Sequence, residues 1–144
     1  MVSDDVISGL TLARDILNSS DCSVVVIKNS QVICKKKGGG VKPFLEAIEE
    51  LGDKLHGCII GDRILGKASS LLCLYSEAKA VYSPQATKTA IALLLIGGIP
   101  SQADRLIPRI DNRDGTDMCP FEKLLENITD PKEAYEALKE KILM

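Results

Sequence analysis

Residues 23–35 constrain the fold of this chain more than any other part of the sequence. Residues 24–27 are Val-Val-Val-Ile, and a continuous run of β-branched residues is typical of a strand that is buried on both faces. Asn29 and Ser30 follow as a two-residue turn, because asparagine tolerates a positive φ, and residues 31–35 return as the second arm of a hairpin. A strand buried on both faces predicts a sheet with helices above and below it.

The rest of the chain alternates between helical and strand patterns. Apolar residues at helical spacing predict helices over residues 4–19, about 42–51, from 66 onward, 85–96, near Pro120, and from 131 to about 142. Strands are predicted over residues 57–61 and 78–82, and residues 106–110 are predicted to form an edge strand that proline interrupts. The segment 85–96 is apolar nearly all round, so we expect that helix to be central.

The order of these elements predicts the fold class. A hairpin followed by alternating helices and strands indicates an α/β domain with three layers, α/β/α, around a mixed five-stranded sheet. A chain of 144 residues suffices for one such core and leaves little for a second, so we expect residues 1–144 to form a single domain.

Composition argues against several classes of partner. A net charge of −2 and 3% aromatic residues provide neither the basic surface nor the stacking platform that nucleic-acid binding uses. The longest apolar stretch, residues 90–96, is too short to cross a bilayer, so we expect no membrane partner. Five widely spaced cysteines without a C-x-x-C motif are typical of free thiols in a reduced compartment, which favours a cytoplasmic location.

The starts of the second and third helices are the best candidate for a binding site. If the first strand lies between the second and the third, the helices that follow those two strands begin at the same edge of the sheet, where such folds bind ligands. Free amides at a helix start, the glycines at 38–40 and a lysine at each start favour a phosphate or carboxylate. We therefore predict a small anionic or nucleotide-like ligand there. The residues expected to contact it are Gly39, Gly40, Lys42, Gly66, Lys67, Ser69, Asn112 and Arg113.

Residues 61–68 nearly match the phosphate-binding loop of P-loop NTPases. Ala68 stands where that motif requires a hydroxyl for Mg²⁺, so we do not expect a P-loop ATPase. Asp62 is equally well explained as a cap for the turn between strand and helix.

The polar loop 111–119 is the most unusual stretch of the sequence. Cys119 precedes Pro120 and therefore suits a helix N-cap, where the helix dipole lowers the pKa of a thiol. Two interpretations stay open: a plain capping cysteine, or a nucleophile that works with Asp117 or Lys67 without a metal. Arg113 and Asp117 are alternatively expected to hold the loop through an ion pair.

His56 is the single histidine of the chain, and it precedes a predicted strand on the side away from the carboxyl edge. We interpret it as a partly solvated turn residue, with a metal or acid–base role as the alternative. A zinc site made of His56, Cys58, Cys73 and Cys119 has no ligand spacing in its favour. We expect no metal and no cofactor.

Three segments taken together resemble a known family. They are residues 40–43 (Gly-Val-Lys-Pro), the segment 61–68 and residues 112–120 (Asn-Arg-Asp-Gly-Thr-Asp-Met-Cys-Pro). They resemble the uncharacterised family called domain of unknown function 1893, and the likeness covers nearly the whole chain. The resemblance implies a cytidine-deaminase-like fold without an established activity.

Zinc deaminases carry a His or Cys with a Glu two residues later at one helix start, and Pro-Cys-x-x-Cys at the next. That arrangement brings three ligands together on a tetrahedral metal. This chain has Lys42 and Lys67 near those two helix starts and none of the ligands. The resemblance therefore implies a deaminase-like domain that is not a zinc deaminase.

Three functions follow as hypotheses. The first is a binding module that holds a small anion between the two helix starts. The second is a metal-independent enzyme that uses Cys119, Asp117 and Lys67 in the same cleft. The third is a non-catalytic interaction domain that forms a homo-oligomer through an exposed sheet edge or helix face.

Overall fold

The structure of the protein, a computed structural model, describes residues 3–144. The helices are α1 (Asp4–Ser19), α2 (Lys42–Leu51), the 3-10 helix η1 (Gly52–Leu55), α3 (Lys67–Tyr75), α4 (Lys88–Ile96), α5 (Pro120–Leu124) and α6 (Pro131–Leu143). The strands are β1 (Val24–Lys28), β2 (Gln31–Lys36), β3 (Ile59–Asp62), β4 (Ile64–Leu65), β5 (Ala80–Thr87) and β6 (Ser101–Ile107).

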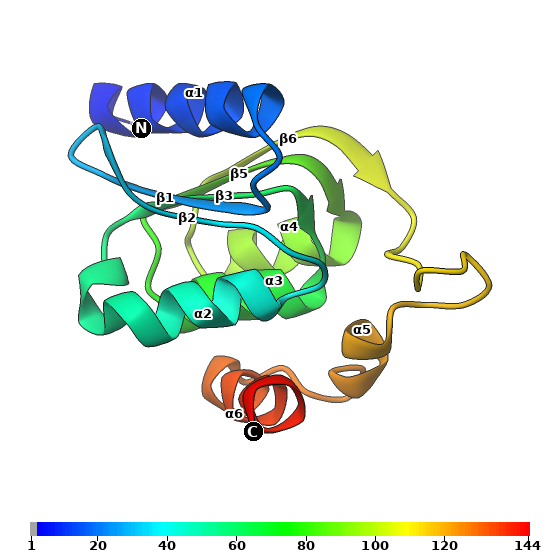
Figure 1. The fold of residues 1–144 in the computed structure, drawn as a ribbon. Coiled ribbons are helices and arrows are strands. Elements are labelled where there is room, and N and C mark those ends of the chain that lie inside the picture. The colour runs from blue at the N-terminus through cyan, green and yellow to red at the C-terminus, as the bar shows by residue number, and fades with distance from the viewer. Residues whose placement is uncertain (1–2) are drawn as a thin grey trace.

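These elements form three layers, as the sequence predicts (Figure 1). Helix α1 covers one face of the sheet, and α2, α3 and α4 cover the other. Helix α6 packs against α3 and α2 from outside, and the short α5 lies between β6 and α6 along the chain. Within residues 3–144, no helix is long and apolar enough to span a bilayer.

The sheet is mixed, with the order β2-β1-β3-β5 and with β6 on the outer side of β5. Strand β1 is antiparallel to both of its neighbours, whereas β3, β4 and β6 are parallel to β5. Strands β3 and β4 are separated by Arg63 and pair with successive parts of β5, so together they act as one interrupted strand. Because β1 lies between β2 and β3, the helices α2 and α3 begin at the same edge of the sheet.

The β1–β2 hairpin has the predicted form and supplies core residues to both faces. Asn29 and Ser30 have φ angles of 52° and 63°, as a two-residue turn of this hand requires. Val25 packs beneath α1, whereas Val26 packs on the opposite face with Phe44 of α2. Both valines are fully buried, which confirms that β1 is covered on both sides.

The boundary between β5 and α4 differs from the prediction, which placed the start of the helix at residue 85. Strand β5 continues to Thr87, whose hydroxyl accepts a hydrogen bond of 3.1 Å from the N–H of Ala90 and caps α4. Pro84 is tolerated inside this central strand because, in the register of β5, it lies opposite the interruption at Arg63. A proline has no N–H to give to a neighbour there.

The last strand was predicted at the edge of the sheet over residues 106–110, and the structure places β6 over Ser101–Ile107. Its edge position is confirmed, because among the described residues β6 pairs with β5 alone. The prediction started too late because residues 101–104 are mostly polar and lack the pattern of a buried strand.

Helix α4 is not central, although its sequence is apolar nearly all round. Ala90 and Leu94 are its buried residues, while Leu95 and Ile96 are 76% and 84% exposed. No described element covers this outer face of α4. The prediction was therefore wrong about the position of the helix, and an uncovered apolar surface results.

Candidate functional site

Helix α5 covers the carboxyl edge of the sheet and reaches the starts of both α2 and α3. The carboxylate of Glu122 accepts hydrogen bonds of 2.8 Å from the backbone N–H groups of Lys67 and Ala68. These residues form the first turn of α3, so Glu122 occupies the anion-binding position that a helix start provides. A side chain of the protein thus lies where the sequence analysis places an external anion.

Gly66 and Gly40 make this close approach of α5 possible. A Cβ atom at position 66 would collide with the side chains of Glu122 and Ile110. A Cβ atom at position 40 would lie 2.8 Å from Cε2 of Phe121, and Gly40 also has a φ of 64°, which favours glycine. Consecutive residues of α5 therefore fill the space next to the starts of α2 and α3.

The other residues predicted to contact the anion are placed differently from one another. Arg113 lies over Gly39, where a Cβ atom would be 3.9 Å from its Nη2. Lys42 is the first residue of α2 and is exposed. Asn112 is turned towards its own loop, because its Oδ1 accepts a hydrogen bond of 3.0 Å from the N–H of Thr116.

A cavity of about 240 Å³ adjoins Glu122 at this edge. Lys67 and Arg109 line it as cations, and Glu122 and Glu126 line it as anions. The hydroxyls of two threonines, Thr87 and Thr89, also line it. The ammonium of Lys67 donates to the backbone carbonyl of Glu126 at 3.1 Å. Cations and hydroxyl donors are suited to binding an anion, and Arg109 pairs with the Asp111 carboxylate at 2.7 Å.

Asp62 is a buried carboxyl behind the start of α3. It is 7% exposed, and its Oδ2 has no hydrogen-bond partner among the described residues. Burial, with a smaller contribution from the nearby Glu122 carboxylate, raises the pKa of Asp62 to about 7. The Ser69 hydroxyl and the N–H groups of Ile64 and Arg63 act in the opposite direction. Ser69 itself is 4% exposed, so this predicted contact residue faces Asp62 rather than open space.

The segment that resembles a phosphate-binding loop is held by other contacts. Ile64 and Leu65 form β4 and pair with β5. The Nη2 atom of Arg63 donates to the carbonyls of Leu17, at 2.8 Å, and Cys22, at 2.7 Å. Arg63 therefore caps the C-terminal end of α1, and the segment serves the packing of the domain.

The two ends of the polar loop 111–119 pair with each other. Asp111 and Met118 form an isolated antiparallel bridge. Asp117 pairs with Lys123, not with Arg113 as the sequence analysis expects. The Lys123 ammonium is the main cause that lowers the pKa of Asp117. The ion pair that holds this loop thus runs to α5.

Cys119 occupies the N-cap position of α5, as predicted, although its side chain makes no capping hydrogen bond. Its thiol is partly exposed, and no described residue forms a hydrogen bond with its sulfur. Asp117 and Lys67, the proposed partners of a nucleophilic Cys119, bind Lys123 and Glu126 instead. The metal-independent enzyme remains a prediction.

His56 lies at the other end of the domain, directly after η1 and in the turn that leads to β3. Its side chain is 48% exposed, and its Nε2 atom lies 3.3 Å from Oε2 of Glu77 and 3.8 Å from Oδ1 of Asp53. This agrees with a partly solvated turn residue. Among residues 3–144, no three His, Cys, Asp or Glu side chains are grouped so that they could hold a metal ion.

Comparison with known proteins identifies the family. Residues 12–142 match the family described as TM1506, domain of unknown function (DUF1893). The chain belongs to this family. A solved structure of a DUF1893 family protein (TM1506) from Thermotoga maritima is 27% identical to it, with a TM-score of 0.86 over 99% of this chain and 93% of that chain.

Two further solved structures match this DUF1893 domain at lower similarity. Acinetobacter baumannii RibD (form 2) is 16% identical, with a TM-score of 0.49 over 68% of this chain and 33% of that chain. The dCMP deaminase of the cyanophage S-TIM5 is 14% identical, with a TM-score of 0.46 over 74% of this chain and 100% of that chain. No curated protein matches the chain in sequence.

The residues that sequence reasoning missed at the carboxyl edge are Phe121, Glu122 and Arg109. Glu122 is 55 positions from Lys67, and its place in a short amphipathic helix resembles that of an ordinary surface residue. The available signal was indirect. Glycines stand at 40 and 66, and a glycine in such a position indicates that some group approaches the backbone closely.

Proposed function

We propose that this DUF1893 domain binds a small anionic, nucleotide-like ligand at the carboxyl edge of its sheet, in place of the Glu122 carboxylate. The observation that carries the proposal is the pair of 2.8 Å hydrogen bonds from the N–H groups of Lys67 and Ala68 to Glu122. Carboxylate and phosphate oxygens use the same donors at a helix start. A helix start that binds an internal carboxylate is therefore suited to a ligand anion.

The residues that line the adjoining cavity support this proposal, but the cavity is small for a nucleotide-like ligand. Lys67, Arg109 and the threonine hydroxyls line a space of about 240 Å³, which is below the 300 Å³ or more that is common for small-molecule sites. Glu122 and Glu126 also line this space, and Arg109 pairs with Asp111. A ligand of nucleotide size must therefore move α5, and withdrawal of Glu122 removes one negative charge from the site.

Competition between Glu122 and the ligand provides the test. Glu122 is part of the same chain, so its effective concentration at the helix start is high. Inorganic phosphate and cytidine monophosphate should bind the wild-type domain weakly and the Glu122→Gln variant at least tenfold more tightly in isothermal titration calorimetry. Lys67→Ala in the Glu122→Gln background should reverse the gain.

Lys54→Ala is the matched control, because Lys54 is an exposed lysine of the 3-10 helix η1, beyond the C-terminal end of α2. It should leave phosphate binding unchanged. Failure of the Glu122→Gln variant to bind either probe at millimolar concentration would contradict the proposed function.

Self-association is a second candidate function, and the outer face of α4 is the observation that favours it. Leu95 and Ile96 are the most exposed large apolar residues inside any helix of the described chain. Exposed apolar side chains of this kind often mark interaction surfaces. We expect a second copy of the chain to cover them. Sedimentation velocity should show a dimer that Leu95→Lys converts to a monomer, and a wild-type monomer would contradict this candidate.

A further inference from the structure

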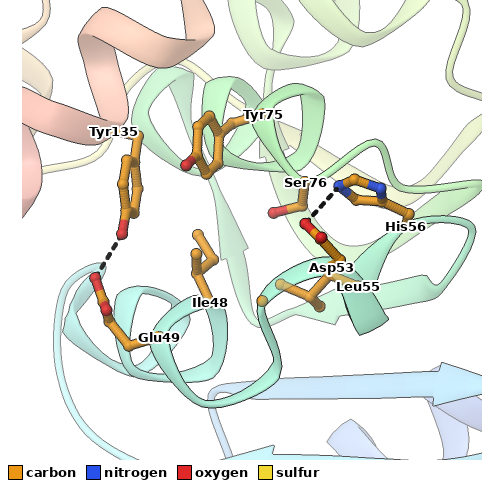
Figure 2. Close-up of a pocket in the computed structure, with 9 residues that line it drawn as sticks. Ile48, Glu49, Asp53, Leu55, His56, Tyr75, Ser76 and Tyr135 are labelled. Atoms are coloured by element: carbon orange, nitrogen blue, oxygen red, sulfur yellow. Dashed lines mark hydrogen bonds and ion pairs between the residues drawn. The ribbon is translucent and has the colours of Figure 1, made fainter.

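A second cavity lies at the end of the domain opposite α5. Its volume is about 370 Å³, which is within the range of small-molecule sites. The C-terminal ends of α2 and α3, the 3-10 helix η1 and one side chain of α6 enclose it (Figure 2). None of its lining residues belongs to the carboxyl edge, so this cavity is separate from the proposed anion site.

The hydroxyl of Ser76 is a buried polar group without a partner in this cavity. Ser76 caps the C-terminal end of α3 and is 3% exposed. Among residues 3–144, its Oγ atom has no hydrogen-bond partner, although buried hydroxyls normally have one. Figure 2 shows this hydroxyl pointing into the space between Tyr75 and Ile48. A group within the cavity is the partner that remains for it.

The electrostatics of the cavity favour a cation. Helices α2 and α3 both end there, and the C-terminal end of a helix carries partial negative charge. Glu49 and Asp53 are two further residues that line this space, and the Asp53 side chain is fully exposed. The free helix N–H groups that would favour an anion lie at the other end of these two helices. The basic side chains next to the cavity are His56, which lines it, and Lys139, which pairs with Glu49.

Glu49 already binds one ammonium group and has capacity for another. The Lys139 ammonium lies 2.9 Å from its Oε1, and the Tyr135 hydroxyl donates to the same oxygen at 2.5 Å. These hydrogen bonds, first that of Tyr135 and then that of Lys139, lower the pKa of Glu49. Among the described residues, its Oε2 has no hydrogen bond. The carboxylate is therefore ionised and has a free acceptor.

Two stacked tyrosines form an apolar wall of the cavity. The rings of Tyr75 and Tyr135 lie 4.2 Å apart between centroids, at an interplanar angle of 10°. The hydrogen bond from Tyr135 to Glu49 fixes the orientation of the second ring. An aromatic wall next to carboxylates suits a ligand that has a cationic group on an apolar body.

We propose that this cavity binds a small organic ammonium compound, whose N–H groups donate to Ser76 Oγ and to the carboxylates of Glu49 and Asp53 while its apolar part packs against the tyrosines. An ammonium group has three donors and no acceptor, so it matches a set of acceptors of this kind. No metal ion is required, and the proposed anion site is not involved.

A matched pair of probes tests the charge requirement. Phenethylamine is protonated at pH 7, and 2-phenylethanol has the same body without the charge. The chain has no tryptophan and three tyrosines, of which Tyr75 and Tyr135 line the cavity, so tyrosine fluorescence reports directly on binding. We expect phenethylamine to bind at least tenfold more tightly than the alcohol. Equal binding of the two, or no binding at millimolar concentration, would overturn the proposal.

Two variants test the residues, and two more serve as controls. Ser76→Ala should weaken phenethylamine binding at least threefold while the protein stays folded, and an unchanged dissociation constant would sink the assignment of Ser76. Glu49→Gln should weaken binding at least tenfold. Glu136→Gln is its matched control, because Glu136 is an exposed glutamate of α6 that does not line the cavity, and it should have no effect. Lys67→Ala should also have no effect, which separates this result from the outcome at the anion site.

Discussion

The two ends of helices α2 and α3 are built in opposite ways. At their starts, the protein supplies its own ligand, because Glu122 binds the free N–H groups and Phe121 fills the space over Gly40. At their C-terminal ends, a larger cavity stays open and the Ser76 hydroxyl has no partner among the described residues. The edge where this type of fold is expected to bind ligands is therefore occupied by side chains of the protein itself, whereas the far end keeps an open cavity.

The largest expected effect on stability comes from removing the buried side chain that fixes α5 to the core. Leu125 follows α5 and is fully buried in the core beneath α3. Leu125→Ala should lower the free energy of unfolding by about 2–5 kcal/mol, as large-to-small core substitutions do. Urea denaturation measures this effect. Leu124→Ala is the matched control, because Leu124 is 39% exposed and should cost much less.

If α5 occupies the N–H groups at the start of α3, then Leu125→Ala should loosen α5 and increase phosphate binding. The phenethylamine site at the other end should be unaffected. Equal losses at both ends would show that the two ends are not independent.

The next test uses pH, because Asp62, at the end where α3 starts, has a pKa near neutrality. Burial raises its pKa in the folded protein to about 7, well above the value of about 3.9 expected when unfolded. The folded state therefore holds the proton more tightly, and the resulting stability is present at low pH and is lost as the pH rises through 7. From pH 5 to pH 8 the loss should be roughly 2–3 kcal/mol.

Asp62→Asn should remove this part of the pH dependence in urea denaturation at the two pH values. Asn keeps the size of the side chain and an acceptor for the N–H groups of Arg63 and Ile64. An unchanged slope between pH 5 and pH 8 would mean that another group is responsible. Glu122→Gln should reduce the slope by a smaller amount, because it removes the nearby negative charge that raises the pKa of Asp62.

A smaller effect is expected from the internal ligand itself. Glu122→Ala leaves the N–H groups of Lys67 and Ala68 without an acceptor, and the loss of such a cap costs about 1 kcal/mol. Thermal unfolding in a buffer without anions of this type should show the loss, and added phosphate should restore part of it. Glu140→Ala, at an exposed position of α6, is the control. Destabilisation that phosphate does not relieve would argue against anion binding at this helix start.

The smallest predicted effect has the opposite sign and belongs to the open end. Ser76→Ala removes a buried hydroxyl that has no partner among the described residues, so the free energy of unfolding should rise by about 1 kcal/mol. Ser70→Ala is the contrasting control. Ser70 is equally buried, but its hydroxyl donates to the carbonyl of Lys67 at 2.8 Å, so its removal should destabilise. If both variants destabilise, Ser76 has a partner, such as a bound water.

Local patterns in the sequence were sufficient for much of the fold. The predicted bounds of α1 and α2 agree with the structure, because apolar periodicity and a cap or proline define both helices. The end of β5 was not predictable in the same way. Residues 83–87 are extended because β3, β4 and β6 pair with β5, and such pairing is a tertiary effect that overrides local propensity.

The sequence indicated which edge of the sheet carries the candidate site, but not which side chains fill it. Gly40 and Lys67 indicated which edge of the sheet is special, and the strand order confirms that α2 and α3 begin there. The partner of that edge could not be found from local patterns, because Glu122 belongs to a distant segment. The cavity near Ser76 gave no signal either, since serine after a helix is common and its unpaired state depends on what surrounds it.

The contacts of Arg63 have a consequence for the order in which the domain folds. The carbonyls at the C-terminal end of α1 accept hydrogen bonds from a side chain that follows more than 40 positions later, and the apolar face of α1 packs on β3 and β5 as well as β1. A lone helix of 16 residues is marginal in water. Although α1 precedes the strands along the chain, its amides should gain lasting protection against hydrogen exchange only after the centre of the sheet has assembled.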